Sequence, residues 1–143
     1  MRLKVVLDTN AVIAALPAWS KFRIVLDALV DDEYDAVVTT EIFMEYEEKL
    51  REKFDQETAD LNLDMFRLLP NVLVQETWFQ FQLISQDPDD NKFVDCALAS
   101  NAHFIVTNDK HFNVLKVIGF PKVNLLTVEE FTSLLLTKTE GSA

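Results

Sequence analysis

Short runs of apolar, β-prone residues alternate along this chain with segments whose apolar residues recur at helical spacing. The runs cover residues 3–7, 34–38, 71–74, 104–106 and 123–126. They are mostly apolar on both faces, which is typical of parallel strands that helices cover on both sides. The alternation therefore predicts an α/β domain with a central, mostly parallel β-sheet flanked by helices on both faces.

The segments between these runs carry start signals of helices. Ser20 is a candidate cap for a helix to residue 30, and Thr39 or Thr40 for a helix to about residue 54. Further helices are predicted over residues 11–16, 57–69, about 110–115 and, after the capping box TVEE at 127–130, to about residue 136. Residues 78–84 are β-prone and predict an extension of the third strand or an edge strand.

The 143 residues suffice for one domain, and a hydrophobic fraction of 49% with 11 Phe supplies its core. We expect this domain over residues 1–136 and a flexible tail over 137–143. Cys96 is the only cysteine, so no internal disulfide can form, and a reducing cytoplasm is the expected location. The first apolar run is too short for a secretion signal or a membrane span, so no membrane association is expected.

Carboxylates stand where two predicted strands end. Asp8 follows the first run directly, and Asp109 follows the run at 104–106 after two polar residues. Asp90 begins the helix before that later run, and Glu45 lies about one turn into the helix after the second run. Because ligands of such sheets bind beyond the carboxyl ends of the strands, all four acids can converge on one crevice.

Four carboxylates brought together repel one another unless a cation lies between them. Oxygen ligands without His or Cys select Mg²⁺ or Mn²⁺. These ions support phosphodiester hydrolysis, because they lower the pKa of the attacking water and neutralise the leaving oxygen. Thr9, Asn10 and Thr107 would then orient carboxylates or waters from outside the ligand set.

Four motifs together resemble the PIN-domain family. They are LDTN at 7–10, an acid early in the helix after Thr39 and Thr40, DPDDNKF at 87–93, and IVTND at 105–109. The resemblance spans residue 3 to about residue 131 and is closest to the branch assigned as toxins of toxin–antitoxin systems. Asn108 stands where the family often has Gly, and Asn also tolerates the left-handed conformation.

The resemblance implies a single PIN-like domain that hydrolyses single-stranded RNA with one or two divalent ions. Carried over by position, the catalytic and metal-binding acids are Asp8, Glu45, Asp90 and Asp109. It also implies a possible antitoxin protein as partner. Dimers are common among PIN-like proteins, and a homo-oligomer is therefore expected.

The third acid has an alternative in Asp95. It lies five residues after Asp90, roughly 140° around the helix, so both cannot point into the same site equally well. Asp90 is preferred, because Phe93 and Ala97 then match the apolar positions of the family. Asp95 stays a possible alternative ligand.

Each acid alone also has a purely structural interpretation. Asp8 is suited to a turn, Asp90 and Asp109 to helix caps, and Glu45 to an exposed pair with Lys49. Only the joint pattern favours a site. Neither histidine, His103 or His111, has a His or Cys partner at zinc-site spacing, so zinc is not expected and a surface position is the simpler interpretation of His111.

The net charge of −11 is a poor match for a protein that binds nucleic acid through basic patches alone. We therefore expect weak RNA binding through metal-bridged phosphate and a few basic side chains such as Lys92, Lys110 and Lys116. A basic partner chain could supply more positive charge. The hydrophobic fraction and the residues WFQF at 78–81 also favour self-association or a partner interface.

Two other functions fit parts of the pattern. One is a PIN-like binding module that has lost activity, which an RNA cleavage assay with Mn²⁺ would identify. The other is a phospho-receiver signalling domain, which is also an acidic α/β sheet with a strand-end Asp. A receiver carries adjacent acids after its first strand, whereas Asp8 is followed by Thr9.

Overall fold

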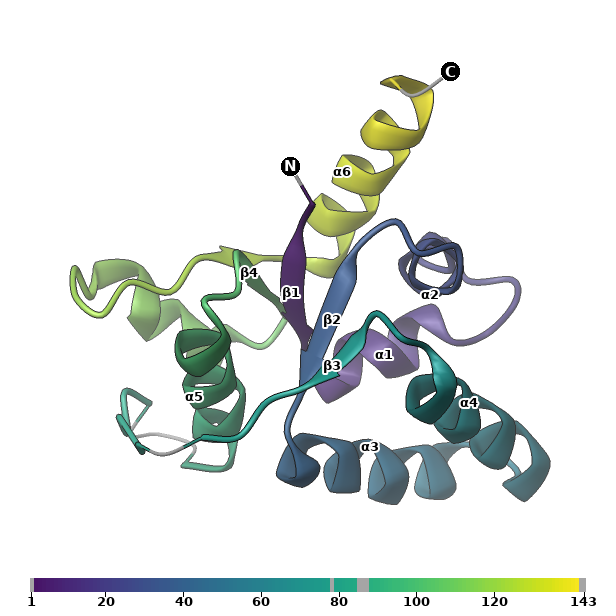
Figure 1. The fold of residues 1–143 in the computed structure, drawn as a ribbon, viewed down its shortest axis with the longest axis horizontal. Helices are drawn as coiled ribbons and strands as arrows, with labels where there is room; N and C mark the ends of the chain where they lie inside the picture. The colour runs from purple at the N-terminus through teal and green to yellow at the C-terminus, as the bar shows by residue number, and fades with distance from the viewer. Residues whose placement is uncertain (1, 78, 85–87, 142–143) are drawn as a thin grey trace.

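The computed structural model describes residues 2–77, 79–84 and 88–141. Within them, five strands form one sheet in the order β3-β2-β1-β4-β5, and every neighbouring pair is parallel (Figure 1). The strands are β1 (Lys4–Leu7), β2 (Asp35–Val38), β3 (Val72–Val74), β4 (Phe104–Val106) and β5 (Leu125–Leu126). The predicted α/β class is confirmed, and β1 is the central strand.

Helices cover both faces of this sheet. The chain steps from β1 to β2 to β3 in one direction and then reverses to reach β4, so right-handed crossovers put α5 on the face opposite α1–α4. Figure 1 shows α5 on one side of β1 and β2, with α1 and α4 on the other. The helices are α1 (Thr9–Ala15), α2 (Ile24–Val30), α3 (Thr40–Lys53), α4 (Gln56–Leu68), α5 (Asn91–Ser100) and α6 (Val128–Gly141), with 3-10 helices η1 (Pro88–Asp90) and η2 (Lys110–Val117). None of the helices in the described ranges is long and apolar enough to cross a lipid bilayer.

The strand order decides between two of the predicted functions. Receiver domains have the order 2-1-3-4-5, whereas this sheet has 3-2-1-4-5, so the receiver interpretation is wrong. In the observed order the direction of winding reverses between β1 and β4. Sheets of this kind bind their ligands at such a reversal, beyond the carboxyl ends of the strands.

The caps of α3 and α6 agree with the prediction, whereas several helix ends differ from it, among them the start of α1 at Thr9 rather than residue 11. Thr39 caps α3 by accepting from the Ile42 N–H, and Thr127 and Glu130 form the predicted capping box at 2.8 and 3.0 Å. However, α2 begins at Ile24 rather than at Ser20, whose hydroxyl instead accepts from the Phe22 N–H within a turn. The 3-10 helix η2 extends to Val117, beyond the predicted residue 115. The last helix continues to Gly141 instead of ending near residue 136, and residues 142–143 lie outside the described residues.

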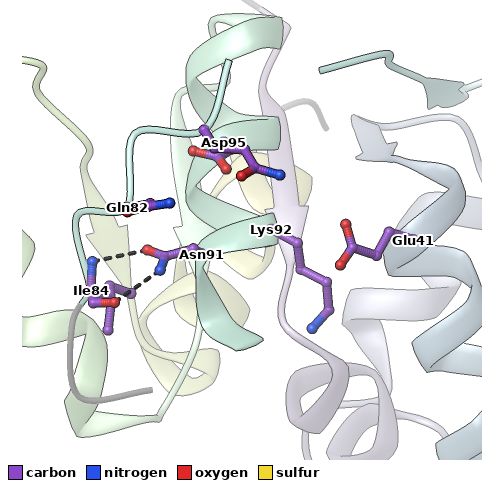
Figure 2. Close-up of a pocket in the computed structure, with 7 residues that line it drawn as sticks. Glu41, Gln82, Ile84, Asn91, Lys92 and Asp95 are labelled. Carbon is purple, nitrogen blue, oxygen red and sulfur yellow. Dashed lines mark hydrogen bonds between the residues drawn. The ribbon is translucent and has the colours of Figure 1, made fainter. Parts of the chain in front are cut away.

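The predicted strand over residues 78–84 is wrong. Trp78 lies outside the described residues, and residues 79–84 have no regular secondary structure. Side chains of α5 take the place of a neighbouring strand: the Asn91 amide bonds both the N–H and the carbonyl of Ile84 at 2.9 Å, and the Asp95 carboxylate accepts from the Phe81 N–H at 3.0 Å (Figure 2 shows the Asn91 pair). The segment therefore lies along α5 rather than in the sheet.

Candidate active site

Asp8 lies at the point where the winding of the sheet reverses. The strand register pairs Leu7 with Val106, so the residues that follow, Asp8 and Thr107, lie side by side. The Asp8 N–H donates to the Val106 carbonyl at 3.0 Å, and the Asp8 carbonyl accepts from two N–H groups in the first turn of α1. Backbone bonds on both sides therefore fix the Cα of Asp8 between β1, β4 and α1.

Asp8 is 4% exposed, and its carboxylate lies close to other negative charges. Burial raises its pKa from the ordinary 3.8 to about 6; a hydrogen bond from Thr107 opposes the shift, and the charges of Asp109 and Glu45 add to it. That bond runs from the Thr107 hydroxyl to Asp8 Oδ2 at 2.8 Å. Ionisation of Asp8 is therefore unfavourable in the folded protein, and a nearby cation would make it favourable.

Glu45 reaches this position from α3. The next residue, Tyr46, is fully buried, and its hydroxyl donates to the Leu7 carbonyl at 2.5 Å, which ties α3 to the end of β1. The Thr9 hydroxyl donates to Glu45 Oε2, and Lys92 Nζ lies 2.8 Å from Glu45 Oε1. Thr9 thus contacts a carboxylate, as expected for a residue that orients ligands.

Lys92 faces Glu45 from α5. Its side chain is only 10% exposed and pairs with Glu45, and its ammonium also donates to the Asp89 carbonyl at 2.5 Å. A contact of Lys92 with RNA stays a prediction, and its ammonium is already engaged by Glu45 and Asp89. Lys92 thus supplies a positive charge within the acidic cluster.

Asp109 follows β4 and also caps η2. Its Oδ1 accepts from the His111 N–H at 2.9 Å, and its own N–H donates to the Thr107 hydroxyl at 3.0 Å. The structural interpretation of Asp109 as a cap is therefore correct, and it does not compete with a role in the site. Thr107 connects the two strand-end acids, because its hydroxyl bonds both the Asp8 carboxylate and the Asp109 backbone.

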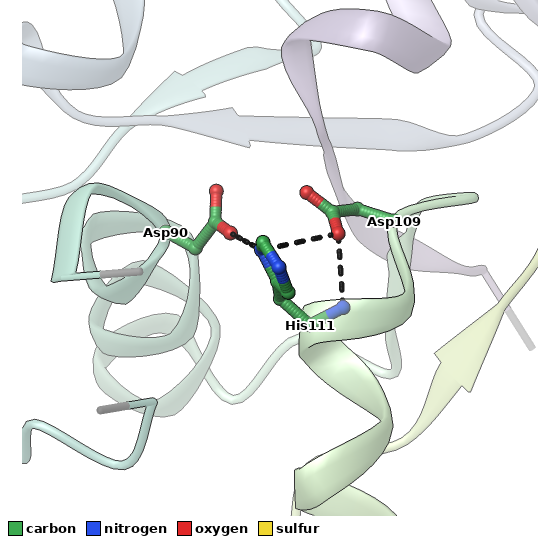
Figure 3. Close-up of side chains that lie close together, drawn as sticks. All are labelled: Asp90, Asp109 and His111. Carbon is green, nitrogen blue, oxygen red and sulfur yellow. Dashed lines mark hydrogen bonds and ion pairs between the residues drawn. The ribbon is translucent and has the colours of Figure 1, made fainter. Parts of the chain in front are cut away.

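The side chain of His111 lies between the carboxylates of Asp90 and Asp109. Little in the sequence indicates this role for His111. The His111 Nδ1 atom lies 3.5 Å from Asp109 Oδ1 and 3.7 Å from Asp90 Oδ2, and Figure 3 shows the ring between the two carboxylates. One ligand atom from each of the three residues lies within 4.8 Å of the others. His111 is exposed, as expected, but its ring is directed toward the acids. The only signal in the sequence was its position two residues after Asp109.

Asp95 and Asn10 do not join this group. Asp95 is buried on another side of α5, where it accepts from the Phe81 N–H, and burial, together with the nearby charge of Glu41, raises its pKa. Asn10 is exposed at the start of α1, and within the described residues its side chain makes no hydrogen bond to the four acids. The structure thus brings Asp90 toward Asp109 and places Asp95 beside a separate cavity.

The donor set fits a divalent cation. Asp8 is buried beside two further charges, and Asp90 and Asp109 offer oxygen atoms within reach of one another. Carboxylate oxygens suit Mg²⁺ and Mn²⁺, and the imidazole of His111 adds a nitrogen that Mn²⁺ accepts more readily than Mg²⁺.

Comparisons with known proteins agree with this description. A family model of the PIN domain matches residues 4–111. VapBC2 from Rickettsia felis, bound to a DNA fragment from its promoter, has 17% identity and a TM-score of 0.61 over 87% of this chain and 98% of that chain. PAE2754 from Pyrobaculum aerophilum has 15% identity and a TM-score of 0.62, over 94% of this chain and 90% of that chain. FitAcB from Neisseria gonorrhoeae has 15% identity and a TM-score of 0.57, over 87% of this chain and 98% of that chain.

These identities establish likeness of fold only. A sequence comparison with curated proteins found no match. The family match covers most of the chain and includes Asp8, Glu45, Asp90 and Asp109. This chain therefore belongs to the PIN domain family.

Proposed function

We propose that this protein is an endoribonuclease that uses Mg²⁺ or Mn²⁺ to hydrolyse phosphodiester bonds of single-stranded RNA. The observation that carries the proposal is the buried Asp8 carboxylate, held by Thr107 with the charges of Asp109 and Glu45 nearby. Repulsion between these carboxylates lowers the stability of the fold, whereas a divalent ion bound between them is attracted by all of them.

Asp8, Glu45, Asp90 and Asp109 would hold the ion, with His111 at its edge. A bound ion of this kind lowers the pKa of the attacking water and offsets the charge of the leaving oxygen. The threonines of the chain fix the ligands: Thr107 holds Asp8, and Thr9 holds Glu45. Lys92 offsets the charge of Glu45 and lowers the repulsion that an incoming phosphate meets.

RNA would bind weakly through the protein alone. The net charge is −11, and the Lys92 ammonium is already paired with Glu45. Phosphate contacts are therefore left to exposed basic side chains such as Lys110 and Lys116. The metal site itself would then be the main attraction for the phosphate.

We further propose that the protein is the toxin of a toxin–antitoxin pair in the cytoplasm and that it forms a homo-oligomer. The similar VapBC2 structure is bound to a DNA fragment from its promoter. An acidic chain of this kind would need a basic partner to make such a contact, which is the role we assign to an antitoxin.

The proposal is tested with purified protein and an unstructured RNA, in Mn²⁺, in Mg²⁺ and in EDTA. Internal cleavage that requires a divalent ion and disappears in Asp8→Asn supports it. The alternative, a PIN-like binding module without activity, predicts intact RNA under all three conditions.

A further inference from the structure

A cavity lies beside Glu45, between α3, α5 and the segment 79–84 (Figure 2). Its volume is about 490 Å³, and its polar lining consists of Glu41, Gln80, Gln82, Asn91, Lys92 and Asp95. Volumes of this order are typical of sites for small molecules or parts of larger ligands. None of the functions assigned above to the four acids uses this cavity.

The wall of the cavity is held by hydrogen bonds rather than left as a loose loop. Both polar atoms of the Asn91 amide are used by the Ile84 backbone, and Asp95 Oδ1 fixes the Phe81 N–H. An ionised carboxylate has about four acceptor positions, so the single bond from Phe81 leaves most of the capacity of Asp95 for a ligand. Figure 2 shows the Lys92 ammonium directed away from Asp95. Asp95 therefore presents a buried acceptor to the cavity.

The cavity adjoins the proposed metal site. Lys92 lines it and also bonds Glu45, and Glu41 lies one turn before Glu45 on α3, about 6 Å along the helix axis. An RNA strand whose phosphate lies at the acids can thus reach the cavity with the base of a neighbouring nucleotide. Recognition of unpaired RNA commonly uses such pockets for the Watson–Crick edge of a base.

Hydrogen-bond chemistry distinguishes which base suits Asp95. Guanine presents two adjacent donors, N1–H and N2–H₂, which match the two oxygens of one carboxylate. Adenine and cytosine place a donor next to an acceptor, and uracil places its donor between two acceptors, so each would bring a lone pair toward Asp95. The exposed amides of Gln80 and Gln82 can donate to the remaining acceptors of guanine.

We propose that this cavity binds the guanine base of a nucleotide next to the cleaved bond, with the Asp95 carboxylate accepting from N1–H and N2–H₂. The proposal rests on the proposed nuclease function for its substrate, and it makes Asp95 a specificity residue rather than a metal ligand.

Binding of nucleoside 5′-monophosphates in EDTA tests the proposal without cleavage. The four nucleotides share one phosphate, so differences between them belong to the base. In ¹H–¹⁵N spectra, GMP should shift the amide signals of Phe81 and Ile84 to saturation. It should bind at least about fivefold more tightly than AMP, CMP or UMP, the lower end for a bidentate contact with a base.

Three variants assign the preference to the cavity. Asp95→Asn keeps an oxygen for the Phe81 N–H but loses the paired acceptors, so the four nucleotides should bind within about twofold of one another. Gln80→Ala, at an exposed position, should weaken GMP binding and leave the fold unchanged. Asp64→Asn removes an equal charge from the exposed surface of α4 and should keep the preference. The spectra themselves report whether each variant is folded.

Equal binding of the four nucleotides, preference for another base, or a GMP preference that survives in Asp95→Asn would each overturn the proposal. Cleavage in Mn²⁺ is read separately. If the protein prefers GMP but leaves RNA intact, the guanine site is supported and the nuclease function is contradicted. If it cleaves RNA but binds the four nucleotides equally, the nuclease function is supported and the guanine site is contradicted.

Discussion

Replacing Asp8 by Asn should stabilise the metal-free protein at neutral pH, although Asp8 is a proposed ligand. The amide side chain of this variant has nearly the same shape as the carboxylate, can still accept from the Thr107 hydroxyl, and bears no charge beside Asp109 and Glu45. A pKa of about 6 in the folded protein against 3.8 corresponds to about 3 kcal/mol of lost stability once Asp8 is ionised. Relaxation lowers this value, so about 1–3 kcal/mol is expected, or roughly 3–10 °C in melting temperature.

The sign of this effect depends on pH in a defined window. Because the pKa of Asp8 is raised in the folded state, the folded protein binds its proton more tightly than the unfolded chain does. The stabilisation from this proton is fully present below pH 3.8 and is lost as the pH rises through about 6. Asp8→Asn and wild type should therefore differ little near pH 4 and most above pH 7.

Urea unfolding in EDTA at pH 4 and pH 8 measures both differences, with Asp64→Asn as the control for loss of one exposed charge. Millimolar Mn²⁺ should reverse the order at pH 8, since ligand bound at 100 times its Kd adds about 2.7 kcal/mol to the protein that binds it. The reasoning is refuted if Asp8→Asn is no more stable than wild type at pH 8 in EDTA, or if its advantage is the same at pH 4.

Three further predictions concern other residues of the proposed metal site and the pair of Lys92 with Glu45. Asp90→Asn should abolish the rise in melting temperature with Mn²⁺, whereas Asp95→Asn should keep it; the opposite result would make Asp95 the third ligand. Electron spin-echo spectra of bound Mn²⁺ should show ¹⁴N coupling that disappears in His111→Gln and persists in His103→Gln, because His103 lies before β4 at the other end of the sheet; coupling that survives in His111→Gln contradicts the assignment. Lys92→Met leaves the partly buried Glu45 without its cation, so it should lower metal-free stability by about 1–2 kcal/mol in urea unfolding and increase the gain with Mn²⁺; unchanged stability would show that the pair contributes nothing.

The sequence allowed the position of the strand-end acids to be predicted, because it depends on local and repeating features. Apolar runs identify buried strands, parallel strands share a carboxyl edge, and Asp8 and Asp109 follow two of them closely. The positions of Glu45 and Asp90 near helix starts made them candidates, and the resemblance to a family supported this choice, since nothing in the helix pattern alone separates Glu45 from Glu41.

The side-chain contacts across elements could not be predicted in the same way. The place of Lys92 depends on how α5 packs opposite α3, and that of His111 on the 3-10 turn that Asp109 caps. Residues 79–84 have β propensity but no strand, because the side chains of Asn91 and Asp95 satisfy their backbone from the neighbouring helix α5. Propensity is overruled there by tertiary hydrogen bonds.

The central claim is that the four acids cleave RNA with a divalent ion. The most direct test is the single-turnover rate of cleavage of an unstructured RNA, measured against Mn²⁺ concentration beside the Mn²⁺ dependence of the melting temperature. We predict no cleavage in EDTA, a rate that saturates at the same Kd as the thermal effect, and loss of both in Asp90→Asn. A rate independent of Mn²⁺, or RNA that stays intact while the protein is saturated with Mn²⁺, would contradict the claim.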